Sequence, residues 1–253
     1  MTAALISANL SYFSLAFLPP VLWLLFYLRE DKHPEPKSLL ILSFVGGMLS
    51  AFLAIFAECL WAIFLTGGSC TNLGSANINP LIIFFGISFI EEYIKYLPVK
   101  FLIHKRVDFD EPVDAMIYMM TAALGFAALE NAIFSFKIFY GTVENPLAVL
   151  PFNQLSLLAG LNIAANRFVG ANLLHALSSG MVGFFLARAW FSPYRRHFLA
   201  LGIFLASVLH TGFNYLILIR ETFSQATFYI ILLLSTMAVM VFIDFERLKR
   251  KTK

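Results

Sequence analysis

Charged residues are scarce in this chain. Asp, Glu, Lys and Arg make up 13% of its 253 residues, whereas a soluble domain carries about 25%. Hydrophobic residues make up 60% of the chain, and the mean hydropathy is +0.80. This composition leaves little room for a soluble domain. It predicts a single all-α integral membrane domain over residues 1–253, built as a polytopic helix bundle.

Cysteine is almost absent as well. The two cysteines are Cys59, which we place in a helix, and Cys70, which we place in a loop. Two cysteines do not make a disulfide framework, so we expect no disulfide and no thiol chemistry. The chain also lacks the H-E-x-x-H motif of zincin proteases and the G-x-S-x-G motif of serine hydrolases. These absences exclude two common routes to peptide hydrolysis.

Seven apolar stretches are long enough to cross a bilayer core of about 30 Å as helices. They cover residues 9–28, 39–66, 80–103, 114–137, 167–190, 198–219 and 223–244. A further apolar run at 147–161, inside the connection 138–166, fits either a re-entrant or an interfacial helix. The sequence therefore predicts about seven transmembrane helices.

Basic residues predict how the chain is oriented in the membrane. Fourteen of the 18 Lys and Arg residues lie in alternate loops and in the tail 245–253, and three lie in the loops between them. Loops rich in Lys and Arg stay in the cytoplasm, so we expect the N-terminus outside and the C-terminus, with its basic tail, inside. This placement favours lipid contact and topology control, and it does not favour nucleic-acid binding.

Three ionisable residues interrupt the stretch 80–103. Glu91, Glu92 and Lys95 lie within five positions of one another, and each costs about 2.5–3.5 kcal/mol at the centre of a membrane helix. Glu91 and Lys95 are spaced i, i+4 and could form a structural ion pair. That alternative leaves Glu92 without a role, so we expect these residues to serve a function.

Polar residues at a similar depth occur in three other stretches. Counted at 1.5 Å per residue, Glu91, Glu130, His175 and His210 lie about 10–16 Å from the outer ends of their helices. The agreement in depth predicts one polar pocket within a catalytic core at residues 80–220. Its members are Glu130 and Asn131, then Arg167, Asn172, His175 and Ser179, and then His210 and Asn214. Glu58, in the stretch 39–66, has no partner that the sequence identifies.

These side chains suit the hydrolysis of an amide by an activated water. A carboxylate in an apolar cavity can take a proton from water and return it to a leaving group. Imidazole and carboxamide N–H groups can donate to a developing oxyanion. The combination needs neither a covalent intermediate nor a cofactor.

Four motifs in order along the chain resemble those of the PrsW family of membrane proteases, which is distantly similar to the CAAX prenyl protease and bacteriocin-immunity group. They are Glu91-Glu92-x-x-Lys95, Glu130-Asn131, His175-Ala176-x-x-Ser179-Gly180 and His210-x-x-x-Asn214. The resemblance covers roughly residues 85–220 and implies a glutamic-type intramembrane protease. It implies that Glu91 is the base, that Glu92 and His175 support it, and that His210 and Asn214 form the oxyanion site.

The resemblance also implies a substrate, a location and a set of supporting residues. The substrate is a membrane-anchored protein, in this family an anti-sigma factor cleaved on its outer side, and the location is a bacterial cell membrane. The supporting residues are Lys95, Glu130, Asn131, Arg167 and Ser179. Two positions depart from the CAAX-type pattern. Lys95 replaces an arginine one position further on, which argues against prenylated substrates, and Phe134 stands where a tyrosine is expected.

Two other function classes fit the same residues. A zinc protease could use Glu91, Glu92, His175 and His210 as ligands instead of as acid–base groups. A proton- or ion-coupled transporter could use them as a relay, although the inverted repeats typical of transporters are missing from the sequence. The sequence indicates no oligomeric state.

Overall fold

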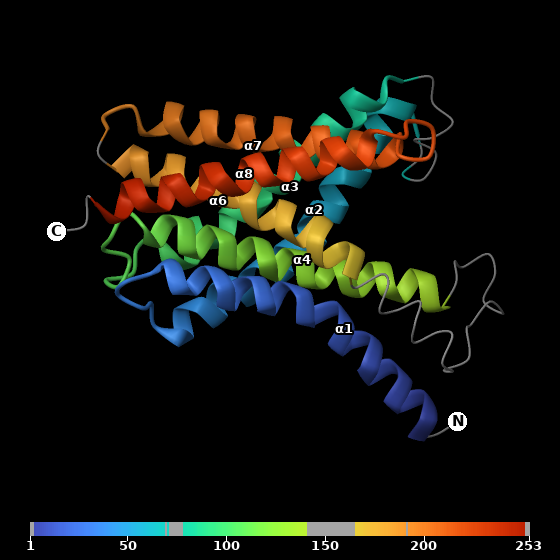
Figure 1. Ribbon diagram of the computed structural model, residues 1–253, viewed down its shortest axis with the longest axis horizontal. Helices are drawn as coiled ribbons and strands as arrows, with labels where there is room; N and C mark the ends of the chain where they lie inside the picture. Colours follow the sequence, from blue (N-terminus) through green and yellow to red (C-terminus); the bar gives the residue numbers. More distant parts are fainter. Residues whose placement is uncertain (1–2, 69, 71–77, 141–164, 191, 251–253) are drawn as a thin grey trace.

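The computed structural model describes residues 3–68, 70, 78–140, 165–190 and 192–250. These residues form seven α-helices and no strand, which confirms the predicted all-α bundle (Figure 1). The helices are α1 (Ala3–Tyr27), α2 (Lys37–Thr66), α3 (Pro80–Pro98), α4 (Asp114–Tyr140), α6 (Leu173–Trp190), α7 (Arg195–Leu218) and α8 (Ala226–Lys249). The run at 147–161 lies outside the described residues.

Five segments of the described chain are long and apolar enough to cross a membrane. They are Lys37–Thr66, Asp114–Ser135, Ala165–Ala189, Arg195–Leu218 and Ala226–Lys249. α3, which carries three charged residues, and α1 are not among them. The predicted number of seven spans therefore stays a prediction, whereas a multi-pass helical architecture is confirmed.

The basic loops gather at one end of the bundle. The connections after α1, α3 and α6 lie at the same end as the C-terminus, and the N-terminus lies toward the other end (Figure 1). Two ion pairs join these segments: Lys249 Nζ lies 2.6 Å from Glu30 Oε2, and His33 Nδ1 lies 2.6 Å from Glu111 Oε1. The basic loops that the charge pattern assigned to one side of the membrane therefore lie at one end of the structure. Which side of the membrane they face stays a prediction.

α4 lies at the centre of the bundle because small residues let its neighbours approach. A Cβ atom on Gly125 of α4 would lie 2.0 Å from the carbonyl oxygen of Phe44, and one on Gly47 of α2 would lie 1.9 Å from that of Ala122. The backbones of α2 and α4 are therefore in direct contact at this crossing. Such crossings at small residues are typical of helices that associate in lipid.

A proline in α1 explains one contact between helices. Pro20 has no N–H, so the carbonyl of Ala16 lacks its usual partner four residues later in the helix. Asn131 of α4 takes that place, because its Nδ2 donates to Ala16 O at 3.0 Å. A freed carbonyl inside a membrane protein needs such a donor from a neighbouring helix.

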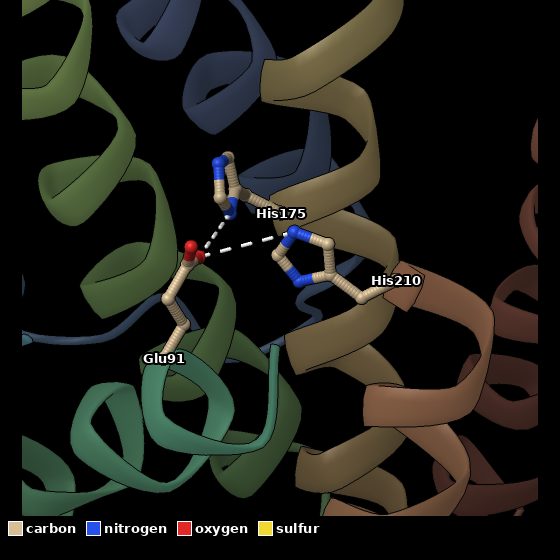
Figure 2. Close-up of side chains that lie close together, drawn as sticks. All are labelled: Glu91, His175 and His210. Carbon is tan, nitrogen blue, oxygen red and sulfur yellow. Dashed lines mark ion pairs between the residues drawn. The ribbon is translucent and has the colours of Figure 1, made fainter. Parts of the chain in front are cut away.

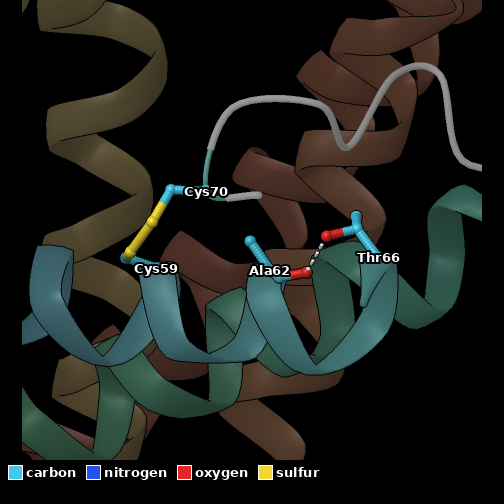
Figure 3. Close-up of a disulfide and its surroundings, with 4 residues drawn as sticks. All are labelled: Cys59, Ala62, Thr66 and Cys70. Carbon is cyan, nitrogen blue, oxygen red and sulfur yellow. Dashed lines mark hydrogen bonds between the residues drawn. A yellow bond between two sulfur atoms is a disulfide. The ribbon is translucent and has the colours of Figure 1, made fainter. Parts of the chain in front are cut away.

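The prediction that Cys59 and Cys70 stay unpaired is wrong. The two residues form a disulfide, with their Cα atoms 4.7 Å apart (Figure 3). α2 continues about two turns past Cys59 to Thr66, and Gly67 then adopts a left-handed conformation with φ of 76°. This turn, which glycine allows at little cost, leads the chain back toward the helix and brings Cys70 over Cys59.

Candidate active site

α3 brings both glutamates and the lysine of its motif into the interior of the bundle. Glu92 and Lys95 are fully buried, and Glu91 is 7% exposed. Lys95 Nζ donates to Glu91 Oε2 and to Glu92 Oε1, each at 3.0 Å, and lies 2.7 Å from Nδ1 of His175. The ammonium therefore has a partner for each of its three hydrogens. Its burial is offset by two carboxylates, as a charge inside a membrane protein requires.

One histidine from α6 and one from α7 face Glu91 (Figure 2). Glu91 Oε2 lies 3.8 Å from Nδ1 of His175 and 3.9 Å from Nε2 of His210. The two imidazole rings meet edge to face, with their centroids 5.2 Å apart. Residues far apart in the sequence thus converge on one point, as the agreement in depth predicts.

Each imidazole also contacts a second carboxylate on its other side. Nε2 of His175 lies 2.8 Å from Glu130 Oε2, and Nδ1 of His210 lies 3.0 Å from Glu92 Oε1. An ionised carboxylate only accepts hydrogen bonds, so the ring nitrogen that faces it carries the hydrogen. The nitrogens that face Glu91 are consequently lone-pair acceptors.

The two glutamates of α3 differ in how many donors surround them. Glu92 accepts from Lys95, from His210 and from the hydroxyls of Ser178 (2.9 Å) and Ser179 (3.0 Å). Within the described part of the chain, the only hydrogen bond to Glu91 comes from Lys95. Glu92 is therefore held in place, whereas Glu91 keeps lone pairs available for a reactant.

Arg167 and Asn131 connect this cluster to the rest of the bundle. Arg167 NH2 lies 3.0 Å from Glu130 Oε2, and its Nε donates to Asn131 Oδ1. Asn131 also donates to Asn172 Oδ1 at 3.0 Å, and Asn172 donates to the carbonyl of Arg167 at 2.7 Å. Arg167 thus pairs with a deep carboxylate and does not extend toward the surface from the end of its helix. Asn131 acts as a bridge between helices.

The structure brings together most of the predicted site residues. Glu91, Glu92, Lys95, Glu130, His175, Ser179 and His210 form one connected cluster, and Asn131 and Arg167 adjoin it. Asn214 lies one turn after His210, is half-buried, and has no hydrogen bond to the described residues of the cluster. The sequence analysis missed Ser178. Its position three residues after His175, on the same face of the helix, is the signal that could have identified it.

Glu58 occupies the inward-facing side of α2. It follows the buried Ala51 and Ala54 at helical spacing and precedes the buried Ala62, while remaining half-buried itself. Ala54 belongs to the same small apolar cluster as Ile94 of α3. Glu58 therefore points toward the helices that carry the site, although no hydrogen bond joins it to them in the described structure.

Three side chains of the cluster could hold a metal ion. Glu91, His175 and His210 each offer one donor atom, and the three atoms lie within 4.8 Å of one another. Three such ligands with a fourth position open are typical of catalytic zinc, and a carboxylate behind each imidazole is its usual support. However, Lys95 uses the lone pair of His175 Nδ1 that a metal would need. The donor set fits a divalent metal in kind and number once Lys95 releases that nitrogen.

The family of this chain follows from a comparison with protein-family models. The model described as "PrsW family intramembrane metalloprotease" matches residues 35–243, a range that contains every residue of the cluster. The chain belongs to this family. It is therefore a membrane peptidase, and it is a multi-pass protein of a bacterial membrane.

Curated relatives agree with the assignment to the PrsW family. Protease PrsW of Oceanobacillus iheyensis is 29% identical over 237 residues, which are 93% of this chain and 94% of that protein. Protease PrsW of Geobacillus kaustophilus is 28% identical over 199 residues, covering 78% and 74%. Protease PrsW of Bacillus subtilis is 27% identical over 196 residues, covering 76% and 75%. Comparison with the solved structures gave no match.

Proposed function

We propose that this PrsW-family protein is a glutamic-type intramembrane endopeptidase in which Glu91 activates the water that cleaves a membrane-anchored protein. The observation that carries the proposal is the contrast between the two adjacent glutamates. Four groups donate to the buried Glu92, whereas Glu91 receives one donor and faces the lone pair of His210 Nε2. A base needs an oxygen free to accept the proton of its substrate, and only Glu91 offers one.

The distance between Glu91 and His210 suits a bridging water. A water that donates to two acceptors at about 2.8 Å each holds them roughly 4 Å apart, and Glu91 Oε2 lies 3.9 Å from Nε2 of His210. Glu91 takes one proton from this water, and the resulting hydroxide attacks the scissile carbonyl carbon, whose oxygen becomes an oxyanion. Glu91 then returns the proton to the leaving nitrogen as the C–N bond breaks, which gives a carboxylic acid and an amine.

Lys95 and Asn214 complete this mechanism. The Lys95 Nζ lies 3.0 Å from Glu91 Oε2 and fixes the position of this carboxylate by a hydrogen bond. The carboxamide of Asn214 lies one turn beyond His210 and has no partner among the described residues of the cluster. A donor without a partner in the ground state is available to the oxyanion.

A second candidate mechanism uses the same residues to hold a divalent metal. It is favoured by the arrangement of Glu91, His175 and His210 and by the word metalloprotease in the description of the matching family. When bound, such a metal would polarise the scissile carbonyl and lower the pKa of a bound water. Glu130 and Glu92 would then orient the two imidazoles.

The orientation of the chain and its substrate belong to the proposal. The Cys59–Cys70 disulfide lies past the middle of α2, toward the end away from the basic loops. Disulfides persist outside the cytoplasm, so this bond supports an extracytoplasmic position for that end and a cytoplasmic C-terminus. A cluster on the outer side of the membrane suits a substrate cut there. In keeping with the family resemblance, we propose a membrane-anchored anti-sigma factor.

The test is co-expression with candidate single-span membrane proteins. The wild type is compared with Glu91→Gln and with Glu221→Gln, a matched change at a side chain that is 88% exposed. We expect a truncated product from the wild type and from Glu221→Gln and none from Glu91→Gln. Comparable cleavage by Glu91→Gln contradicts the assigned base.

Treatment of the purified enzyme with a chelator separates the two mechanisms. Activity that survives the chelator supports the metal-free mechanism. Activity that is lost and then restored by zinc supports the metal-dependent one.

A further inference from the structure

An apolar groove of about 630 Å³ lies between α3 and α7, with Trp61 of α2 as part of its wall. Its outer rim faces the surroundings of the bundle: Ile82 is 52% exposed, and Phe89 and Val208 are each 43% exposed. For a helix bundle embedded in a membrane, these surroundings are lipid. The groove is therefore open to a molecule that arrives laterally within the bilayer.

The inner end of the groove lies beside the candidate active site. Ile90 and Thr211 line it, and they are the chain neighbours of Glu91 and His210. Glu91 keeps a small exposed fraction of 7%, whereas Glu92 has none. The groove thus runs from the lipid-facing side of the protein to the positions next to Glu91 and His210, whose own side chains are not part of its lining.

The polar groups of the lining are already used within the protein. The hydroxyl of Thr211 donates to the carbonyl of Ser207 at 2.6 Å, and the indole N–H of Trp61 donates to the carbonyl of Ile83 at 3.3 Å. A charged occupant would lose its hydration and find no partner in this lining, which is unfavourable. An apolar occupant loses nothing, because the lining is as apolar as lipid.

We propose that this groove receives the apolar transmembrane segment of the substrate next to the bond to be cut. The inference rests on the proposed function, since it takes Glu91 as the end point of the path. A membrane protease must take its substrate from the bilayer, and this groove opens to the bilayer and ends at the chain neighbours of Glu91 and His210. It selects segments with small or aliphatic side chains on both sides of the scissile bond and disfavours charged ones.

Gly212 offers a precise way to fill the groove. It lines the groove, and a Cβ atom added to it would meet nothing within 4 Å. Gly86, on the opposite wall, differs, because a Cβ atom there would lie 2.2 Å from the indole of Trp61. Gly212→Leu therefore introduces a side chain into the groove at a position where its Cβ atom meets no neighbouring atom.

The experiment is disulfide cross-linking in proteoliposomes that contain the full chain. The natural cysteines are bonded to each other, so Val208→Cys supplies a single free thiol. The matched control is Ile217→Cys, on the same helix, outside the groove and equally exposed at 43%. The probe is a set of Leu/Ala transmembrane peptides in which one cysteine moves along the length. All variants carry Glu91→Gln, so the result does not depend on catalysis.

We expect at least tenfold more peptide cross-linking at Val208→Cys than at Ile217→Cys. Adding Gly212→Leu should remove the excess, and a peptide with lysine beside its cysteine should cross-link less than its alanine counterpart. Equal cross-linking at the two positions overturns the proposal, and so does an excess that Gly212→Leu leaves unchanged. Equal cross-linking is also the result expected if a lipid chain fills the groove. A failure here leaves the role of Glu91, which the cleavage assay tests, unaffected.

Discussion

The two neighbouring glutamates should respond to the same substitution in opposite ways. Glu91→Gln should abolish cleavage and leave the fold intact, whereas Glu92→Gln should primarily destabilise the fold. The reason is the difference in their partners. Glu92 is fully buried and holds four donors from α3, α6 and α7, whereas Glu91 holds one.

The size of each effect follows from these contacts. Removing one member of a buried ion pair costs about 3–5 kcal/mol. For a chain of this length, 1 kcal/mol shifts the melting temperature by about 2–4 °C, so Glu92→Gln should lower it by about 6–20 °C. Glu91 accepts one hydrogen bond and is partly exposed, so Glu91→Gln should lower the free energy of unfolding by only about 1.5 kcal/mol and the melting temperature by about 3–6 °C. Loss of a general base lowers the rate by about 10²–10⁴-fold.

The assay measures both quantities on the same samples. Detergent-solubilised wild type, Glu91→Gln, Glu92→Gln and the exposed control Glu221→Gln are heated in steps, and the protein that stays monodisperse is quantified by size-exclusion chromatography. Cleavage of a co-expressed substrate is scored in parallel. Equal melting temperatures for the two site variants would refute the division of roles between Glu91 and Glu92, and so would a stable, active Glu91→Gln.

The described contacts support four further predictions. Asn131→Ala leaves buried partners on two other helices unpaired, so the free energy of unfolding should fall by about 1–3 kcal/mol for each. Asn214→Ala should leave the melting temperature unchanged and lower kcat by about 10²–10³-fold. Gly125→Val places a side chain where the carbonyl of Phe44 already lies 2.0 Å from the Cβ position, so we expect loss of monodisperse protein, whereas Gly125→Ala should give a milder loss. Burial raises the pKa of Glu35, in the loop between α1 and α2, from 4.5 to about 8. The folded state therefore binds this proton more tightly than the unfolded state, so melting temperatures should fall as the pH rises from about 5 to 8 and Glu35→Gln should flatten that fall. A profile that is the same with and without Glu35→Gln contradicts the assignment.

Periodicity and depth were sufficient to predict the helices and the meeting of Glu91, His175 and His210. Apolar length fixes where a membrane helix can lie, and the rise per residue fixes how deep a side chain sits. Both are local properties that can be counted along the chain. The small residues at Gly47 and Gly125 could be identified as packing positions for the same reason.

Which side chains form hydrogen bonds with one another could not be predicted in this way. Whether Ser178 or Ser179 faces Glu92 depends on how α6 is rotated against α3, and both hydroxyls turn out to donate. The sequence analysis placed Glu92 beside Glu91 as a support, but it could not show that four donors hold it. The disulfide was missed because it depends on the direction of the chain after Gly67, which a count of cysteines does not contain.

The bond between Asn131 and the carbonyl that Pro20 leaves free has a consequence for the N-terminal helix. From Ala16 a continuous series of polar contacts runs through Asn131, Arg167 and Glu130 to the imidazole of His175. The first helix is thereby connected to the reaction centre through hydrogen bonds and an ion pair, by way of the carbonyl of Ala16. We therefore expect a change that displaces the first helix at Ala16 to shift the imidazole of His175 as well.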